Sequence, residues 1–227
     1  MMTTTCIIPV YNEFGRIGSI LRSIEKLTAI DQIICVDESN DGSDREIANF
    51  SRVQLIHFTK RLGKAEAVKV GLKYCTSENV LLMDSDFIGV GVDELARGIE
   101  IFEHNKIDML VFRQKDNAQI YQLLKLDLTV SGERILKTKT LTEIISTKVH
   151  GYQLEMHIND YFIRHPELAV YHLPLAGHNV FKFLRRGWKA GLKDGITMMR
   201  DTIGYRGLRY YMNHVLTCHW KEWSERQ

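Results

Sequence analysis

The chain has 227 residues, 44% hydrophobic and 26% charged, a composition typical of a globular protein with a sizeable core. It contains no run of eighteen apolar residues and no charged segment followed by a short apolar stretch. We therefore expect neither a membrane-spanning helix nor a secretory leader. The four cysteines show no metal or disulfide spacing, which favours a reducing, cytoplasmic setting.

The formal net charge of +2 hides an asymmetry along the chain. Residues 181–227 carry ten Lys or Arg against four Asp or Glu, whereas residues 1–180 carry 20 against 24. We accordingly predict a folded domain over 1–180 and a basic, partly amphipathic helical extension over 181–227. The extension could lie on an anionic membrane surface as a peripheral contact on the inner face, or it could be a solvated surface helix. No feature indicates a nucleic-acid partner.

Predicted strands and helices alternate through the first half of the chain. The strands are expected at Thr4–Val10, Gln32–Val36, Val53–Phe58, Val80–Met83 and Met109–Phe112, and the helices at Arg16–Leu27, Asp44–Phe50, Lys64–Tyr74 and Glu94–His104. Residues 116–149 contain helical pieces without clear boundaries. The alternation predicts an α/β fold with a mainly parallel sheet and helices on both faces.

An acidic triplet, Asp84-Ser85-Asp86, directly follows the apolar run Val80–Met83. Such a run is typical of a strand buried on both faces, so the charges lie where that burial ends, at the carboxyl edge of the sheet. Two carboxylates there could share one Mg²⁺ or Mn²⁺, ions that commonly bridge carboxylates to nucleotide phosphates. The alternative is an acidic turn without metal.

The loops after the first three strands should open on the same edge. They are Pro9–Glu13, Asp37–Ser43 and Arg61–Lys64. A carboxylate there can accept a hydrogen bond from a base or a ribose hydroxyl, and a lysine can meet a diphosphate. Each loop alone is ordinary turn chemistry, but their joint placement favours a nucleotide site. Dinucleotide oxidoreduction is not expected, because no GxGxxG follows the first strand.

Taken in order, residues 7–13, 36–43, 62–72 and 83–86 resemble the motifs of family 2-like glycosyltransferases, which have the GT-A fold. The resemblance implies a UDP- or GDP-sugar donor, a Mn²⁺ or Mg²⁺ cofactor at the DxD triplet, and sugar transfer to an acceptor. It places Pro9, Tyr11, Glu13 and Asp37 in the base and ribose pocket, Lys64 near the diphosphate, Asp84 between ribose and metal, and Asp86 on the metal as a catalytic residue. Glu38 stands where a second Asp is common, and Ala65 replaces a frequent Gly, so the identity of the base stays open.

The domain would divide into a nucleotide-sugar half, 1–90, and an acceptor half, 91–180. Residues 151–155 and 173–179 resemble the acceptor side of polyprenyl-phosphate sugar transferases and of glucosyl-3-phosphoglycerate synthase-like enzymes. This implies that Glu155 binds or activates the acceptor, that His178 completes the metal shell, and that Arg134 meets an acceptor phosphate. The alternatives are a helix N-terminal carboxylate, a loop histidine without metal and a surface arginine.

We expect a metal-dependent glycosyltransferase, and the basic extension favours a lipid phosphate as acceptor. A soluble hydroxyl acceptor, such as a phosphoglycerate or a saccharide, is the alternative. The acceptor decides the role of Glu155, because a phosphate needs no general base whereas a hydroxyl does. From another class, a non-catalytic nucleotide-binding module or a nucleotidyltransferase would also fit carboxylates on an α/β sheet.

Overall fold

A computed structural model describes residues 3–115, 128–129, 131–146, 153–179, 207, 210, 217–218 and 220–224. Its strands are β1 (Thr4–Val10), β2 (Gln32–Asp37), β3 (Val53–His57), β4 (Asn79–Leu82), β5 (Phe87–Ile88), β6 (Met109–Gln114), β7 (Arg134–Lys137), β8 (Val170–Leu175), β9 (His178–Asn179) and β10 (Lys221–Glu222). Its helices are α1 (Ile17–Ile24), α2 (Ser43–Ile47), α3 (Lys64–Leu72), α4 (Val92–His104), α7 (Thr138–Ile145) and α8 (Gln153–Arg164).

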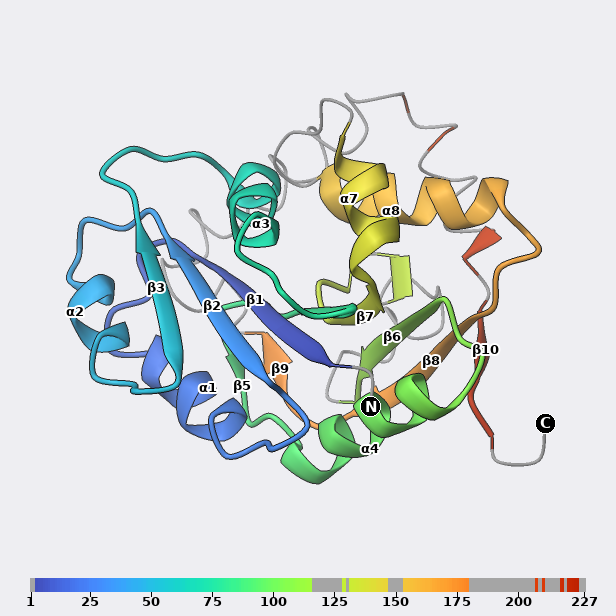
Figure 1. Cartoon of the computed structure of the whole chain (residues 1–227), viewed down its shortest axis with the longest axis horizontal. Helices are drawn as coiled ribbons and strands as arrows, with labels where there is room; N and C mark the ends of the chain where they lie inside the picture. The colour runs from blue at the N-terminus through green and yellow to red at the C-terminus, as the bar shows by residue number, and fades with distance from the viewer. Residues whose placement is uncertain are drawn as a thin grey trace.

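Eight of the described strands form one mixed sheet in the order β10-β8-β6-β7-β4-β1-β2-β3 (Figure 1). Neighbouring strands are parallel except at β7, which is antiparallel to both β4 and β6. The short strands β5 and β9 pair antiparallel in a second, two-stranded sheet. The carboxyl ends of β1, β2, β3 and β4 therefore meet at one edge, as predicted.

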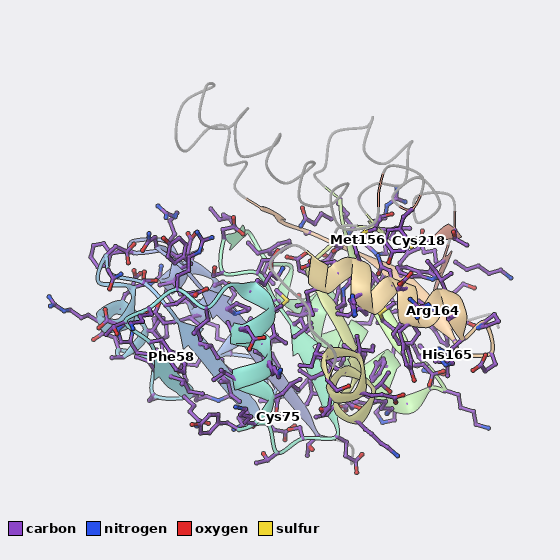
Figure 2. The ribbon with its side chains drawn as sticks, turned by 90° about the horizontal axis from the view of Figure 1, so that it is seen from above. Phe58, Cys75, Met156, Arg164, His165 and Cys218 are labelled. Atoms are coloured by element: carbon purple, nitrogen blue, oxygen red, sulfur yellow. The ribbon has the colours of Figure 1, made fainter. Side chains whose placement is uncertain are left out.

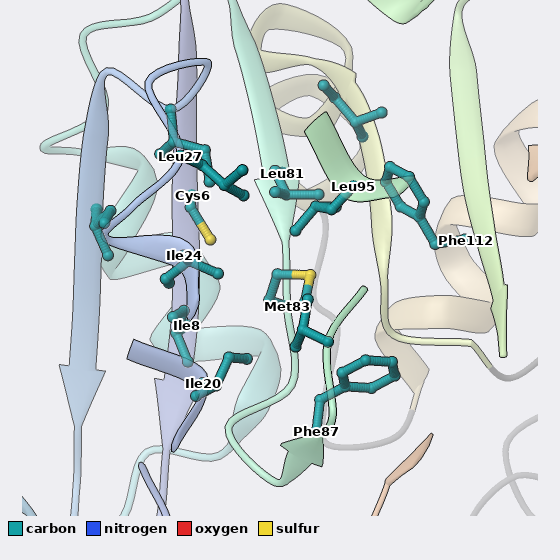
Figure 3. Packing of buried hydrophobic residues seen from close by; sticks show 14 of the residues in the cluster. Cys6, Ile8, Ile20, Ile24, Leu27, Leu81, Met83, Phe87, Leu95 and Phe112 are labelled. Carbon is teal, nitrogen blue, oxygen red and sulfur yellow. The ribbon is translucent and has the colours of Figure 1, made fainter. Parts of the chain in front are cut away.

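Helices cover both faces of the sheet (Figure 1). On one face, α1 and α4 pack on alternate residues of the central strands, including Cys6, Ile8 and Leu81. Figure 3 shows Ile20, Ile24 and Leu27 lying against these strand residues, with Leu95 and Phe112 beside them. On the other face, α3, α7 and α8 pack on the remaining residues of the same strands. Period-two alternation in each strand thus supplies two separate cores.

The elements predicted up to residue 112 are confirmed, with boundaries that differ by a few residues. The β1 boundaries, Thr4–Val10, are those predicted. Helix α1 ends before the predicted Leu27, because the last α-helical bond runs from the Glu25 N–H to the Leu21 carbonyl and the Leu27 N–H then donates to the Ile24 carbonyl in a tighter turn. The predicted α/β class, with a mainly parallel sheet and helices on both faces, is confirmed.

The end of the chain contributes to the same sheet. Strand β10 pairs with β8, and the Trp223 ring meets the Tyr171 ring edge-on with centroids 5.1 Å apart. This end of the predicted extension therefore packs on the main domain. Residues 180–206, which carry the aromatic and basic segment, lie outside the described part. Among the described residues, no helix is long and apolar enough to cross a membrane.

Candidate active site

Asp84 lies at the carboxyl end of β4, on the side of the sheet covered by α3 and α8. Leu81 and Met83 pack with α1 and α4, whereas Val80 and Leu82 pack with α3, α7 and α8. The same alternation turns the next side chain, Asp84, toward the helix α3. The acidic triplet therefore begins where β4 leaves the core, as the sequence indicated.

Lys64 joins the two halves of the predicted site. It is the first residue of α3, and its ammonium contacts Asp84 Oδ1 and lies 2.6 Å from Glu155 Oε1, in the first turn of α8. Burial alone would lower the pKa of Lys64, but the Asp84 and Glu155 carboxylates outweigh burial and raise it above its ordinary value. One cation thus neutralises a predicted donor-side carboxylate and a predicted acceptor-side carboxylate.

The antiparallel strand β7 closes this site from the other side. Leu82 pairs with Arg134 in the β4–β7 ladder, so continuing the register places Gly132 opposite Asp84. The backbone of Gly132 closely approaches the Asp84 carboxylate. A Cβ built on Gly132 would lie 2.5 Å from Asp84 Oδ2 and 2.7 Å from its Cγ. Only a residue without a side chain fits here while Asp84 keeps its place.

Glu133 and Arg134, the next two residues, are fully buried. Glu133 Oε2 accepts hydrogen bonds from Gln114 Nε2 and Ser131 Oγ, each at 3.1 Å. Burial raises the pKa of Glu133 to about 7, and the charge of Asp84 acts in the same direction. Arg134 donates to Asn159 Oδ1 at 2.9 Å and to the Ser131 carbonyl. The surface alternative for Arg134 is therefore wrong, and its predicted contact with an acceptor phosphate stays a prediction.

The loop after β1 is fixed by hydroxyls from the loop after β2. Asn12 has a left-handed φ of 57°, and its N–H donates to Ser39 Oγ at 2.7 Å. The Glu13 N–H donates to Ser43 Oγ at 2.9 Å, and the Glu13 carboxylate is buried beside Arg16, whose Nε lies 2.7 Å away. The two loops thus form one unit at the sheet edge, with Glu13 inside it.

Asp37 ends β2 and has no exposed surface. Its Oδ1 accepts the Ser39 hydroxyl at 2.5 Å, and its Oδ2 lies 2.8 Å from His57 Nδ1. His57 ends β3 and is paired with Asp37 in the ladder. Asp37 is therefore enclosed by partners of its own chain, and His57 is the exposed member of the pair.

Glu38 holds the loop that leads into α3. Its Oε2 accepts hydrogen bonds from the backbone N–H groups of Leu62 and Gly63, the latter at 2.8 Å. On the same loop, the Arg61 guanidinium lies 4.4 Å from the centroid of the Tyr11 ring. Tyr11 is 37% exposed. The longer side chain at position 38 therefore contacts the backbone just before Lys64.

Asp86 follows in the turn before β5 and is partly buried. Its predicted co-ligand, His178, is placed by its backbone, which pairs with Ile88 in the β5–β9 ladder. The His178 side chain lies outside the described part of the structure. Among the described residues, no group of three or more His, Cys, Asp or Glu has an arrangement that could hold a metal ion.

The structure thus brings Lys64, Asp84 and Glu155 together and places Tyr11 and Asp37 at the neighbouring strand ends. Pro9 is partly buried within β1, and Glu13 faces Arg16. Sequence reasoning assigned no individual role to four residues of this edge: His57, Arg61, Gly132 and Glu133. His57 ends β3, one residue before the end of the predicted strand Val53–Phe58, and could have been found by the rule that identified Asp84. The positions of Gly132 and Glu133 depend on the register of β7, which was not predicted.

Comparison with known proteins identifies the class. Residues 5–156 match the model of glycosyl transferase family 2, and the chain belongs to that family. It is a glycosyltransferase with the GT-A fold.

Three solved structures of glucosyl-3-phosphoglycerate synthase from Mycobacterium tuberculosis share this fold at 20% sequence identity. The complex with Mn²⁺, UDP and phosphoglyceric acid matches with a TM-score of 0.65, covering 84% of this chain and 77% of that one. The complex with Mn²⁺ and UDP-glucose gives 0.67, with 89% and 79% covered. A further structure of the same enzyme gives 0.68, with 89% and 81% covered. No curated protein matches the sequence significantly.

Proposed function

We propose that this protein transfers a sugar from a UDP-sugar to the hydroxyl of a small soluble acceptor, such as a phosphoglycerate or a saccharide, with Mn²⁺ or Mg²⁺ as cofactor. The observation that carries the proposal is the Lys64 ammonium, shared between Asp84 and Glu155 at the carboxyl edge of the sheet. It joins a donor-side and an acceptor-side carboxylate in a chain of glycosyl transferase family 2.

The choice of a soluble acceptor over the lipid phosphate favoured by the sequence rests on the structural neighbours. Two of those structures contain UDP or UDP-glucose as nucleotide, and one of them contains phosphoglyceric acid as second ligand. The argument for a lipid rested on the basic extension, whose segment 180–206 lies outside the described residues. A peripheral membrane contact through that segment stays a prediction.

The donor set fits the proposed metal. Asp84 and Asp86 supply hard carboxylate oxygens two residues apart, which suit Mg²⁺ and Mn²⁺. Asp84 Oδ1 contacts the Lys64 ammonium. The family resemblance assigns Asp86 as the more direct ligand, with His178 as a further one. When bound, the metal would supply positive charge against the diphosphate leaving group.

Residues of the chain would assist the departure of the diphosphate and the removal of the acceptor proton. The bond between the anomeric carbon and the diphosphate oxygen breaks, and the Lys64 ammonium can donate to the oxygens on which negative charge develops. A hydroxyl acceptor loses its proton as its oxygen bonds to the anomeric carbon. Glu155, buried beside Lys64, is placed to receive that proton as general base.

The proposal is tested by measuring release of UDP from UDP-glucose and other UDP-sugars with Mn²⁺. A panel of acceptors would contain 3-phosphoglycerate, saccharides and a polyprenyl phosphate. We expect UDP release that depends on metal and on a soluble hydroxyl acceptor. Turnover with the lipid phosphate alone would overturn the soluble assignment, and pyrophosphate release would indicate a nucleotidyltransferase.

A matched pair of variants separates the acceptor classes further. Glu155→Gln should abolish transfer to a hydroxyl while UDP still binds, because it removes the proton acceptor and the charge beside Lys64, whereas the amide oxygen can still accept a hydrogen bond from the Lys64 ammonium. Glu143→Gln removes a carboxylate that contacts Tyr161 on the α7–α8 surface and should leave transfer unchanged. If Glu155→Gln kept normal turnover, the acceptor would need no base, as a phosphate does not.

A further inference from the structure

We propose that His57, rather than Asp37, recognises the nucleobase of the donor, and that it selects bases carrying a ring N–H donor, such as the imide of uracil. The inference rests on the proposed function, because it assigns a specificity residue to the same nucleotide-sugar site. It differs from what the family resemblance implies, because the resemblance assigns Asp37 to the base pocket and gives His57 no role.

Asp37 is unsuited to direct contact with a base in this structure. Its side chain has no exposed surface, and both of its oxygens have partners within the chain. Oδ1 accepts from the Ser39 hydroxyl and also from the Ser39 N–H at 3.3 Å. Oδ2 contacts His57 Nδ1 at 2.8 Å. A base could reach this carboxylate only after the loop after β2 had moved.

His57 has the exposure and the chemistry that Asp37 lacks. Its side chain is 32% exposed at the carboxyl end of β3. An ionised carboxylate only accepts hydrogen bonds, so Nδ1 carries the proton in the contact with Asp37. In the neutral ring, Nε2 is then an acceptor. Among the described residues, the side chain of His57 hydrogen-bonds to Asp37 through Nδ1, and Nε2 is left to accept a hydrogen bond from a ligand.

The neighbouring residues supply the rest of a base site. Val10 pairs with Asp37, and Asp37 pairs with His57, so the ends of β1, β2 and β3 lie side by side. Tyr11 follows Val10 with its ring partly exposed, and the Arg61 guanidinium lies over that ring. These are planar groups on which a base can stack. Figure 2 marks Phe58, the residue that follows His57 at this end of the sheet.

The ligand class follows from the acceptor at Nε2. Uracil presents an N3–H donor, whereas the corresponding nitrogen of cytosine is an acceptor and would face another lone pair. A site built to hydrogen-bond one partner rejects an analogue that lacks the group, since the site's polar atom is then left unpaired. UDP should therefore bind more tightly than CDP. Asp37 acts as a positioning residue that fixes the tautomer of His57.

The test is isothermal titration of UDP and CDP, each with Mn²⁺, into the full chain. We expect the wild type to bind UDP at least about tenfold more tightly than CDP, a difference of about 1.4 kcal/mol. His57→Leu should lose this preference by weakening UDP binding while CDP binding changes little. His104→Leu, which replaces an exposed histidine at the end of α4, is the matched control and should bind as the wild type does.

A double-mutant cycle distinguishes direct from indirect action of Asp37. If Asp37 acts through His57, Asp37→Asn should weaken UDP binding in the wild type and have no further effect in the His57→Leu background. Equal losses in both backgrounds would show that Asp37 contacts the base itself and would overturn the proposal. So would an unchanged ratio of UDP to CDP affinity in His57→Leu. Wild-type protein that binds neither nucleotide would instead refute the proposed function.

Discussion

The close approach of Gly132 to Asp84 yields the most specific prediction of this structure. In Gly132→Ala, the new Cβ would lie 2.5 Å from Asp84 Oδ2, which is inside van der Waals contact. The oxygen would have to move by roughly 0.9 Å to regain an ordinary separation. Gly132 is absent from the glycines with positive φ, so the backbone accepts alanine and the effect is purely steric.

That displacement should cost activity more than stability. Asp84 is partly exposed, with 22% of its side chain accessible, so its carboxylate can swing away instead of unfolding the strand. The movement would break its contact with Lys64 and misplace a candidate ligand of the metal and the ribose. A misplacement of about 1 Å typically costs about 10²-fold in rate, or about 2.7 kcal/mol of transition-state stabilisation.

The assay compares kcat/KM for UDP-sugar turnover with the midpoint of thermal unfolding. Gly98→Ala is the matched control, because a Cβ there would press into the Phe112 ring, inside the core and away from the sheet edge. This overpacking should cost about 1–3 kcal/mol of stability and leave turnover near normal at a permissive temperature. If folded Gly132→Ala kept wild-type kcat/KM, the argument that the backbone at position 132 positions Asp84 would be refuted.

Three further predictions concern neighbouring carboxylates. Asp86→Ala should abolish metal-dependent transfer without lowering the thermal unfolding midpoint, and near-normal turnover with Mn²⁺ would contradict its role as a ligand. Glu38→Asp should draw the carboxylate away from the Leu62 and Gly63 N–H groups and reduce stability by about 1–3 kcal/mol, as urea unfolding would measure; an unchanged midpoint would show that the contact contributes nothing. The pKa of Glu133 is raised from 4.5 to about 7, so the folded state holds a proton that the unfolded state releases, and stability falls as pH rises through this window. Glu133→Gln should therefore gain about 1–3 kcal/mol relative to wild type between about pH 5 and about pH 8, and a constant difference would refute the buried ionisation.

The nucleotide half of the fold could be predicted because its signals are local. Strands β1 to β4 are short apolar runs, and each is followed by polar residues at the edge where parallel strands end. Asp84 and Lys64 follow from that rule without any knowledge of packing. The family resemblance placed Asp37 in the base and ribose pocket, but it could not show that His57 contacts one of the Asp37 oxygens, because that contact depends on two strands being neighbours.

The acceptor half was harder to predict because its contacts depend on one non-local pairing. Arg134 illustrates the difficulty, since arginine is rarely fully buried and sequence reasoning expected it on the surface or on a ligand. The structure places it between Asn159 and the Ser131 carbonyl. Glu133 likewise gives no local sign that it is buried below the site.

The reversal of β7 explains why these distant residues meet. A strand antiparallel to β4 begins at the edge where β4 ends, so the residues before it, Gly132 and Glu133, reach Asp84. The strand then ends beside the start of β4, where the Thr138 N–H donates to the Glu78 carbonyl and α7 begins. Helix α7 runs back across the sheet, and α8 starts near the carboxyl edge with Glu155 in its first turn. A single reversed strand thus accounts for both the backbone that presses on Asp84 and the carboxylate that shares its lysine.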